Sequence, residues 1–188
     1  MRLTTTLNLI RKAGPCGIRP NKDGTLSGYL KLLQHVGDNY DADAEINLLT
    51  ILESNGVQDT LWCLRATVQD SKRIAAQLAI EFAAEVLPIF EARYPNDTRV
   101  RDCIQGARDY LEGKITLEEL LVLRRAAYAA AAYAAYAYAA AAAGAAAAAY
   151  AAAYAVAADA YAYAYAAADA RNKMGKRQAD IIRSILEQ

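Results

Sequence analysis

The sequence predicts an all-α protein, and three of its features point to that class. Residues 126–170 contain 32 alanines and 9 tyrosines among 45 positions, and alanine has the highest helix propensity of any residue. Apolar residues recur at helical spacing through much of residues 57–125. No run of alternating β-branched residues is long enough to indicate a strand. We therefore expect a helical bundle with a long Ala/Tyr-rich helical hairpin.

Residues 1–55 are expected to form an N-terminal helical layer. A short helix over residues 3–13 leads into a loop that is dense in glycine and proline. Two further helices are expected, one capped by Thr25 or Ser27 and one over residues 46–53. This layer has no motif that assigns it a chemical role.

Residues 56–125 are expected to form the helical core of the protein. Their longest helix begins near Asp70 and extends to about Tyr94, with apolar residues at near-helical spacing along it. Pro88 lies inside this helix. A proline removes one backbone hydrogen bond, so we expect the helix to be kinked or divided there.

Two later helix starts have recognisable caps. Asp97 precedes a helix that begins near Thr98, and an aspartate suits the N-cap position. Thr116 and Glu119 have the spacing of a capping box, in which each side chain bonds the backbone amide of the other residue. The helix that starts at Thr116 is expected to continue directly into the Ala/Tyr-rich tract.

The tract itself, residues 126–170, is expected to form two antiparallel helices hinged near Gly144, followed by a short basic C-terminal helix in residues 171–188. Its tyrosines occupy at least two helix faces, and a helix that is apolar all round is normally buried or shared with another subunit. We therefore expect a homo-oligomer. A membrane hairpin is disfavoured because alanine contributes little to insertion. The tyrosines expected to pack at interfaces are Tyr128, Tyr133, Tyr136, Tyr150 and Tyr154.

Composition argues against several classes of function. The formal charge is zero overall, with −1 in residues 1–125, −2 in the tract and +3 in residues 171–188, so general nucleic-acid binding is not expected. One histidine (His35) and three scattered cysteines supply too few ligands for a metal site. No phosphate-binding glycine motif is present, and we expect no cofactor. The cysteine pattern and the N-terminus, which lacks a secretory signal, predict a cytoplasmic setting.

Arginines near one expected corner of the chain are the main candidates for ligand binding. Arg99 and Arg101 fall in the first turn of a helix, beside free backbone amides, and Arg108 shares a helix face with Arg101. Arginine beside a helix N-terminus suits phosphate or carboxylate, and Tyr94 lies next to the same corner. The alternative is that these arginines pair with neighbouring carboxylates such as Asp97.

Trp62 and Arg65 form a second candidate pair. A tryptophan edge beside an arginine can stack a base or anchor a partner protein. The alternative is that Trp62 belongs to the apolar core. Cys63, between them, is expected to be a core residue because it lies on an apolar helix face.

Four stretches of the chain together resemble a known family. They are LWCLR at 61–65, DSKRIAA at 70–76, LPIFE at 87–91 and YPNDTRVRDCI at 94–104, and an alanine-rich helical tail follows them. This combination is similar to the Imm-5-like "putative immunity protein" family over about residues 56–170. The family occurs in bacterial and bacteriophage genomes, and the tyrosine content of the tail resembles its phage-borne branch, which implies the cytoplasm of a bacterial host.

The resemblance implies a binding protein and not an enzyme. Our first hypothesis is a phage counter-defence protein that sequesters a small nucleotide immune signal, with Arg99, Arg101, Arg108, Trp62, Arg65 and Tyr94 as ligand-binding residues. The alternative is an immunity protein that neutralises a toxin or defence effector protein by direct binding through an aromatic helical surface. A hydrolase that destroys such a signal is a third hypothesis, disfavoured because metal ligands and a usable histidine are lacking.

Overall fold

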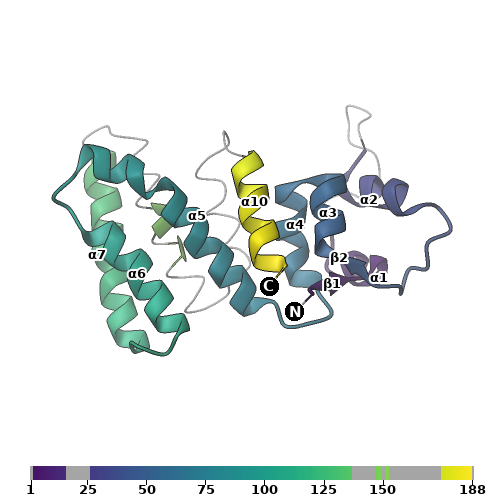
Figure 1. The fold of residues 1–188 in the computed structure, drawn as a ribbon, viewed down its shortest axis with the longest axis horizontal. Helices are drawn as coiled ribbons and strands as arrows, with labels where there is room; N and C mark the ends of the chain where they lie inside the picture. Colours follow the sequence, from purple (N-terminus) through teal and green to yellow (C-terminus); the bar gives the residue numbers. More distant parts are fainter. Residues whose placement is uncertain (1, 16–25, 137–146, 150, 153–174, 188) are drawn as a thin grey trace. The chain divides into compact units, whose positions relative to one another are not determined.

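A computed structural model describes residues 2–15, 26–136, 147–149, 151–152 and 175–187 (Figure 1). These residues are predominantly helical, which confirms the all-α class. The chain divides into two compact units, which we call unit 1 (Met1–Ser71 with Ile182–Gln188) and unit 2 (Lys72–Ile181). The four segments expected from the sequence, 1–55, 56–125, 126–170 and 171–188, stay predictions.

Unit 1 is built from short elements. Two antiparallel strands pair Thr4 with Asn47 and Thr5 with Ile46. The helices around this small sheet are each no more than about two and a half turns long. In chain order the elements are β1 (Thr4–Thr5), α1 (Leu7–Lys12), α2 (Gly28–Val36), β2 (Ile46–Asn47), α3 (Leu48–Asn55), α4 (Val57–Cys63) and the 3₁₀ helix η1 (Leu64–Ala66).

The two strands replace the first residues of helices that the sequence analysis placed over 3–13 and 46–53. The expected boundaries were wrong because each helix has a capping side chain inside the expected range. Thr6 Oγ1 accepts a hydrogen bond from the Leu9 amide at 3.1 Å, and Asn47 Oδ1 accepts one from the Leu49 amide at 2.9 Å. A capped helix begins after its cap, and the β-branched residues before these caps are extended.

The core of unit 1 is aliphatic and aromatic. Its buried members come from α1, α2, β2, α3, α4 and η1, and Trp62 packs against them while remaining partly exposed. Cys63 is 4% exposed, which confirms it as a core residue. The buried set is Leu7, Ile10, Tyr29, Leu32, Ile46, Ile51, Cys63 and Ala66.

Unit 2 is built from longer helices: α5 (Lys72–Arg93), α6 (Arg99–Leu111) and α7 (Leu117–Tyr136). The expected division of the helix at Pro88 does not occur, because α5 is helical through all of its 22 residues. The expected kink stays a prediction. Pro88 is exposed while Val86 and Phe90 are buried. Packing therefore holds the helix on both sides of the proline, and the carbonyl that loses its partner lies on the side that water can reach.

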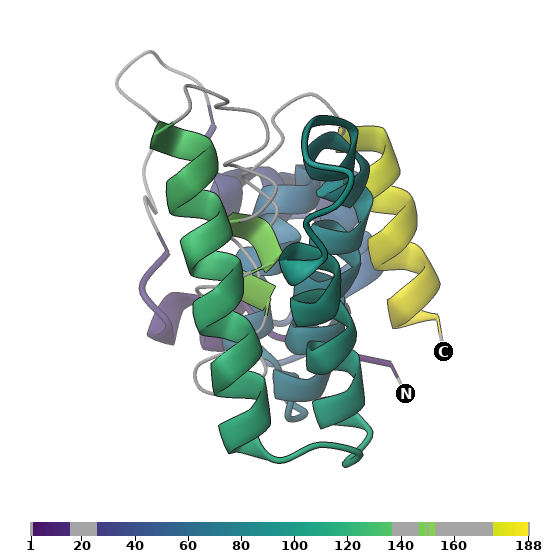
Figure 2. The same cartoon turned by 90° about the vertical axis from the view of Figure 1, so that its left-hand side faces the viewer.

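The interior of unit 2 is rich in alanine. The helices α6 and α7 lie side by side (Figures 1 and 2), and Gly106 of α6 faces Leu123 of α7. A Cβ atom on Gly106 would lie 2.3 Å from Leu123 Cδ1. Small residues at such contacts let helix axes approach closely. The fully buried alanines of the unit include Ala75, Ala79, Ala83, Ala107, Ala127, Ala130 and Ala134.

Only part of the Ala/Tyr-rich tract lies within the described residues. Its first eleven residues, 126–136, continue α7 as expected, and residues 147–149 and 151–152 are also helical. The expected hinge at Gly144, Tyr150 and Tyr154, and the side chain of Tyr136, lie outside the described part. The last helix, α10 (Gly175–Leu186), has residues in both units.

Within the described ranges, no helix is both long enough and apolar enough to cross a membrane.

The capping box is confirmed: Glu119 Oε2 accepts a hydrogen bond from the Thr116 amide at 2.8 Å, and Thr116 Oγ1 accepts one from the Glu119 amide at 3.3 Å. This box fixes the start of α7. The bond from the Thr116 amide, and after it a hydrogen bond that the Thr116 hydroxyl donates to Glu119 Oε2 at 2.9 Å, lower the pKa of the Glu119 carboxyl.

Candidate partner-binding site

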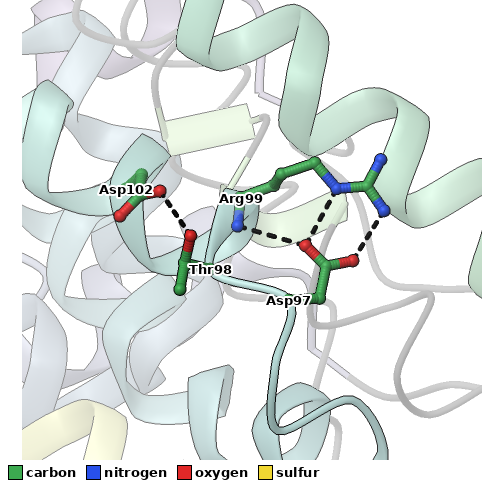
Figure 3. A network of polar contacts seen from close by, with 4 residues as sticks. All are labelled: Asp97, Thr98, Arg99 and Asp102. Atoms are coloured by element: carbon green, nitrogen blue, oxygen red, sulfur yellow. Dashed lines mark hydrogen bonds and ion pairs between the residues drawn. The ribbon is translucent and has the colours of Figure 1, made fainter.

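The turn between α5 and α6 contains two ion pairs, Asp97 with Arg99 and Glu91 with Arg101. We call these four residues and the neighbouring Tyr94 the arginine corner. Figure 3 shows its centre, where Asp97 Oδ1 accepts hydrogen bonds from the Arg99 amide at 3.2 Å and from Arg99 Nε at 2.8 Å. Arg99 Nη2 donates to Asp97 Oδ2 at 2.6 Å. The N-cap residue of α6 is Thr98 and not Asp97 as expected, but Asp97, one residue earlier, still bonds the Arg99 amide at the start of the helix.

The ion pair at the corner fixes the charge of both partners. The Arg99 side-chain hydrogen bonds are the main reason why the pKa of Asp97 is lowered, and its amide bond and charge add to them while burial opposes. The pKa of Arg99 is raised, chiefly by the same side-chain bonds. Both groups are ionised at neutral pH, and the side chain of Arg99 is held in one orientation.

The other two predicted arginines also face carboxylates. Arg101 Nε donates to Glu91 Oε1 at 2.7 Å, and Arg108 Nη2 lies 3.0 Å from Glu81 Oε1. Internal pairing, the alternative considered for the corner arginines, is therefore what the structure contains. A ligand role for these residues stays a prediction, and an anion would have to compete with carboxylates already in place.

The helix α7 exposes three large apolar side chains, Val122, Tyr128 and Tyr133, with exposed fractions of 59%, 61% and 57%. Val122 and Tyr133 lie on the same side of the helix, whereas Tyr128 is rotated from them by roughly 120–140°. We call the exposed set Val122, Arg125, Tyr128, Ala129 and Tyr133 the outer face of α7. The opposite face, with Leu120, Ala127, Ala130 and Ala134, is fully buried.

Tyr133 joins the outer face of α7 to the arginine corner. Its ring meets the ring of Tyr94 edge-on, with centroids 5.7 Å apart, and Tyr94 in turn lies 5.2 Å from Phe90. Arg99 is close enough to Tyr133 for the two to interact electrostatically. Phe90 is 1% exposed, so this aromatic chain anchors an exposed tyrosine to the core. Through this contact Tyr133 of the outer face lies against Tyr94 of the arginine corner.

The six residues predicted to bind a ligand are divided between the two units. Trp62 and Arg65 belong to unit 1, whereas Tyr94, Arg99, Arg101 and Arg108 belong to unit 2. The Arg65 guanidinium lies 5.1 Å from the centre of the Trp62 ring. Arg108 lines a separate cavity of about 180 Å³ between α5 and α6.

The thiols and the single histidine do not form a catalytic or metal-binding group in the described part of the chain. Burial is the main cause that raises the pKa of Cys63 and of Cys103 to about 12, so both are neutral thiols at pH 7. His35 is exposed in the last turn of α2. Among the described residues, no three His, Cys, Asp or Glu side chains are placed to hold a metal ion.

Sequence reasoning missed Val122 as a surface residue. The signal was available, because two positions along a helix correspond to about 200° of rotation. A helix that buries Leu120 therefore exposes Val122.

Sequence reasoning also missed a polar cluster in unit 1, Asn55 and Asp59 beside Tyr29, because its members come from three helices without a common motif.

Comparison with known proteins assigns the family. The model of the "Imm-5 like putative immunity protein" family matches residues 65–188, which is more than half of the chain. The chain belongs to this family, as the four sequence stretches suggested. No curated protein and no solved structure matches it. The matched region contains α5, α6 and α7, and so includes both the arginine corner and the outer face of α7.

Proposed function

We propose that this protein is an immunity protein that neutralises a toxin or effector protein by binding it directly. The contact surface we assign is the outer face of α7 together with the arginine corner. The observation that supports it is the group of exposed large apolar side chains, Val122, Tyr128 and Tyr133, on one helix of the family-matched region. Groups of this kind mark sites of protein interaction.

The chemistry of this surface suits a protein partner. Tyrosine and arginine are the residues enriched in the energetic centres of interfaces. Ala129 lies between the larger side chains of α7, so a partner can approach the helix backbone closely. Arg99 and Arg101 are held at the edge by their carboxylate partners. A preformed edge of this kind lowers the entropic cost of binding.

The nucleotide-sequestration hypothesis stays a prediction, as do the phage origin and the homo-oligomer. Asp97 already occupies two guanidinium nitrogens of Arg99 that a phosphate would need. The family assignment therefore favours the immunity alternative over the first hypothesis. Neutralisation by occupancy requires no catalytic group in this chain, which agrees with the expectation of a non-enzymatic role.

The proposal is tested by photocrosslinking from the outer face of α7. A photoreactive phenylalanine analogue replaces Tyr128, the protein is illuminated in its native cell, and the crosslinked partner is identified. The partner must arrest growth when it is expressed alone, and co-expression of the wild-type chain must restore growth. Tyr133→Arg should weaken binding by about 30-fold or more, because it removes an aromatic anchor, and growth should no longer be restored.

A matched control separates surface disruption from misfolding. Val68 is an exposed apolar residue of unit 1, with 51% of its surface accessible, so Val68→Arg adds the same charge at a residue that does not belong to the assigned surface. Val68→Arg should protect as well as the wild type. Protection by Tyr133→Arg would refute the assigned surface, and crosslinking only to a second copy of the chain would make this face an oligomer interface instead.

A further inference from the structure

A cavity of about 180 Å³ lies between α5 and α6 of unit 2, and the proposed function does not use it. None of the described residues that line it belongs to the outer face of α7 or to the arginine corner. The lining comes from successive turns of α5 and from the end of α6, and it includes Arg73, Gln77, Glu81, Arg108, Leu111 and Glu112. Arg73 and Glu112 are exposed, so the cavity is open to solvent.

The charged groups around the cavity leave one cation without a carboxylate. Glu81 pairs with Arg108, whose Nη2 lies 3.0 Å from Glu81 Oε1, and Glu112 pairs with Lys114. Arg73 forms no ion pair with a carboxylate of the described residues. Three cations and two anions therefore leave one net positive charge, which a single monovalent anion would balance.

Arg73 is anchored by one hydrogen bond. Its Nη1 donates to the Leu111 carbonyl at 3.0 Å, at the end of α6, where a helix has carbonyls without a helical partner. Its Nε and Nη2 donate to no other described residue. These are the two nitrogens through which Arg99 binds both oxygens of Asp97. Arg73 therefore offers a second, vacant fork for bidentate binding of a carboxylate.

Gln77 supplies a neutral donor beside Arg73. The two residues are four positions apart, so they lie on one face of α5. The side chain of Gln77 is partly exposed and makes no hydrogen bond with another described residue. A glutamine amide has two N–H donors. Two neighbouring side chains with accessible donors therefore line the same cavity.

The size and charge of the cavity select the class of anion. Drug-sized ligands occupy pockets of roughly 300–1,000 Å³, so about 180 Å³ is too little for a nucleotide. A phosphoryl group carries roughly −1.5 to −2 charges at pH 7, and Glu81 and Glu112 would repel the excess. A carboxylate has one charge and two acceptor oxygens. Leu111 provides an apolar contact for the methylene groups behind it.

We propose that this cavity binds a carboxylate, which accepts hydrogen bonds from Nε and Nη2 of Arg73 and from the side-chain amide of Gln77. The group is supplied either by a glutamate side chain of a partner protein or by a small free carboxylic acid. The cavity shares no residue with the surface assigned above, so either proposal can fail without the other.

Nuclear magnetic resonance of the full-length protein tests the proposal. The backbone amide signals of α5 and α6 are followed at pH 7 and constant ionic strength, during titration with propionate, with its neutral analogue propionamide and with inorganic phosphate. We expect saturable shifts with propionate, with a dissociation constant in the millimolar range for so small a ligand. Propionamide should give no saturable shift, and phosphate should bind more weakly than propionate.

Two variants of equal charge test the role of Arg73. Arg73→Gln removes the vacant fork and should weaken propionate binding by about tenfold or more. Arg93→Gln removes the same charge from an exposed residue of α5 that does not line the cavity, and it should bind as the wild type does.

Gln77→Met keeps the size of the side chain and the bond between Arg73 and Leu111 but removes the amide donors. It should weaken propionate binding by about threefold. Unchanged binding by Arg73→Gln or by Gln77→Met, an equal loss in Arg93→Gln, or no saturable shift with propionate would each overturn the proposal. An equal response to propionamide, or tighter binding of phosphate, would overturn it as well.

A further pair of probes distinguishes the two sources of the carboxylate. Nα-acetyl-glutamate N-methylamide presents the group as a protein would, and propionate presents it as a free acid. Comparable saturation by both supports a glutamate of a partner protein. Saturation by propionate alone supports a small free acid, because the cavity then excludes the peptide backbone.

Discussion

The two units differ in how their backbone carbonyl groups are hydrogen-bonded and in how their helices pack. In unit 1, where the chain turns often, buried hydroxyl groups bond backbone carbonyls: Thr5 Oγ1 donates to Ala66 and Ser71 Oγ donates to Leu64. Thr5 and Ser71 are both fully buried. In unit 2, long helices satisfy their own carbonyls, and the buried positions are largely alanine. The short elements of unit 1 are therefore stabilised by particular polar contacts, whereas the long helices of unit 2 are stabilised by packing closely against one another.

This difference predicts which substitutions each unit tolerates. An alanine-lined contact has no free volume for a larger side chain, because protein interiors are close-packed. Replacing a buried hydroxyl by an apolar group of the same size is tolerated only if the carbonyl oxygen that accepted its hydrogen bond gains another donor. The three predictions below test this comparison, from the largest expected effect to the smallest.

Ala130→Leu should lower the free energy of unfolding by about 1–3 kcal/mol, since overpacking a close contact has that cost. Ala130 is fully buried on α7. The neighbouring Ala129 is exposed on the same helix, so Ala129→Leu should change stability by less than about 0.5 kcal/mol. Urea unfolding of both variants measures the difference. Equal effects would show that the alanine interior is not closely packed.

Thr5→Val should lower the free energy of unfolding by about 1–2 kcal/mol, because the shape is kept while the Ala66 carbonyl loses its donor. Thr5→Ser keeps the hydroxyl and loses only a methyl group, so it should be the milder change. The same urea experiment ranks the two variants. If the serine variant is the less stable one, the methyl contact outweighs the hydrogen bond and the contrast between the units is weaker.

Asp97→Asn should lower the free energy of unfolding at pH 7 by less than about 1 kcal/mol, because Arg99 is 39% exposed and solvent screens the pair. Asparagine still offers an oxygen to the Arg99 amide, so this variant isolates the charge. The lowered pKa of Asp97 means that its contribution is present above about pH 4 and is lost as the pH falls through the folded-state value.

The difference between wild type and Asp97→Asn should therefore shrink steadily as the pH falls below about 4, near the usual aspartate pKa. Urea unfolding at a series of pH values measures it. A difference that persists unchanged at pH 2 would mean that the substitution acts through packing and not through charge.

Local chemistry explains what the sequence predicted correctly. The all-α class followed from alanine content and helical spacing, and the capping box at Thr116 and Glu119 followed from two residues at a fixed distance. Both depend on neighbours along the chain. The continuity of α5 through Pro88 could not be predicted in this way, because it depends on Val86 and Phe90 being held by the rest of unit 2.

In the candidate sites too, the features that depend on residues brought together by the fold could not be predicted from the sequence. Arg99 and Arg101 were located correctly at a corner, but their partners Asp97 and Glu91 decide what they can bind, and only the fold selects among neighbouring carboxylates. The polar cluster of Tyr29, Asn55 and Asp59 was not predicted at all. Its polar residues lie on α2, α3 and α4, and the small loops and caps that bring these helices together leave no spacing in the sequence.

The contact between Gly106 and Leu123 has a consequence for how this family diverges. A Cβ atom at position 106 would meet the end of the Leu123 side chain, so a larger residue at position 106 requires the Leu123 side chain to move. Members of the family that have alanine or serine at the first position are expected to have a shorter or differently branched residue at the second. The distance between α6 and α7 would then depend on residues 106 and 123 together. A substitution that is neutral in one relative would be harmful when it is transferred alone to another.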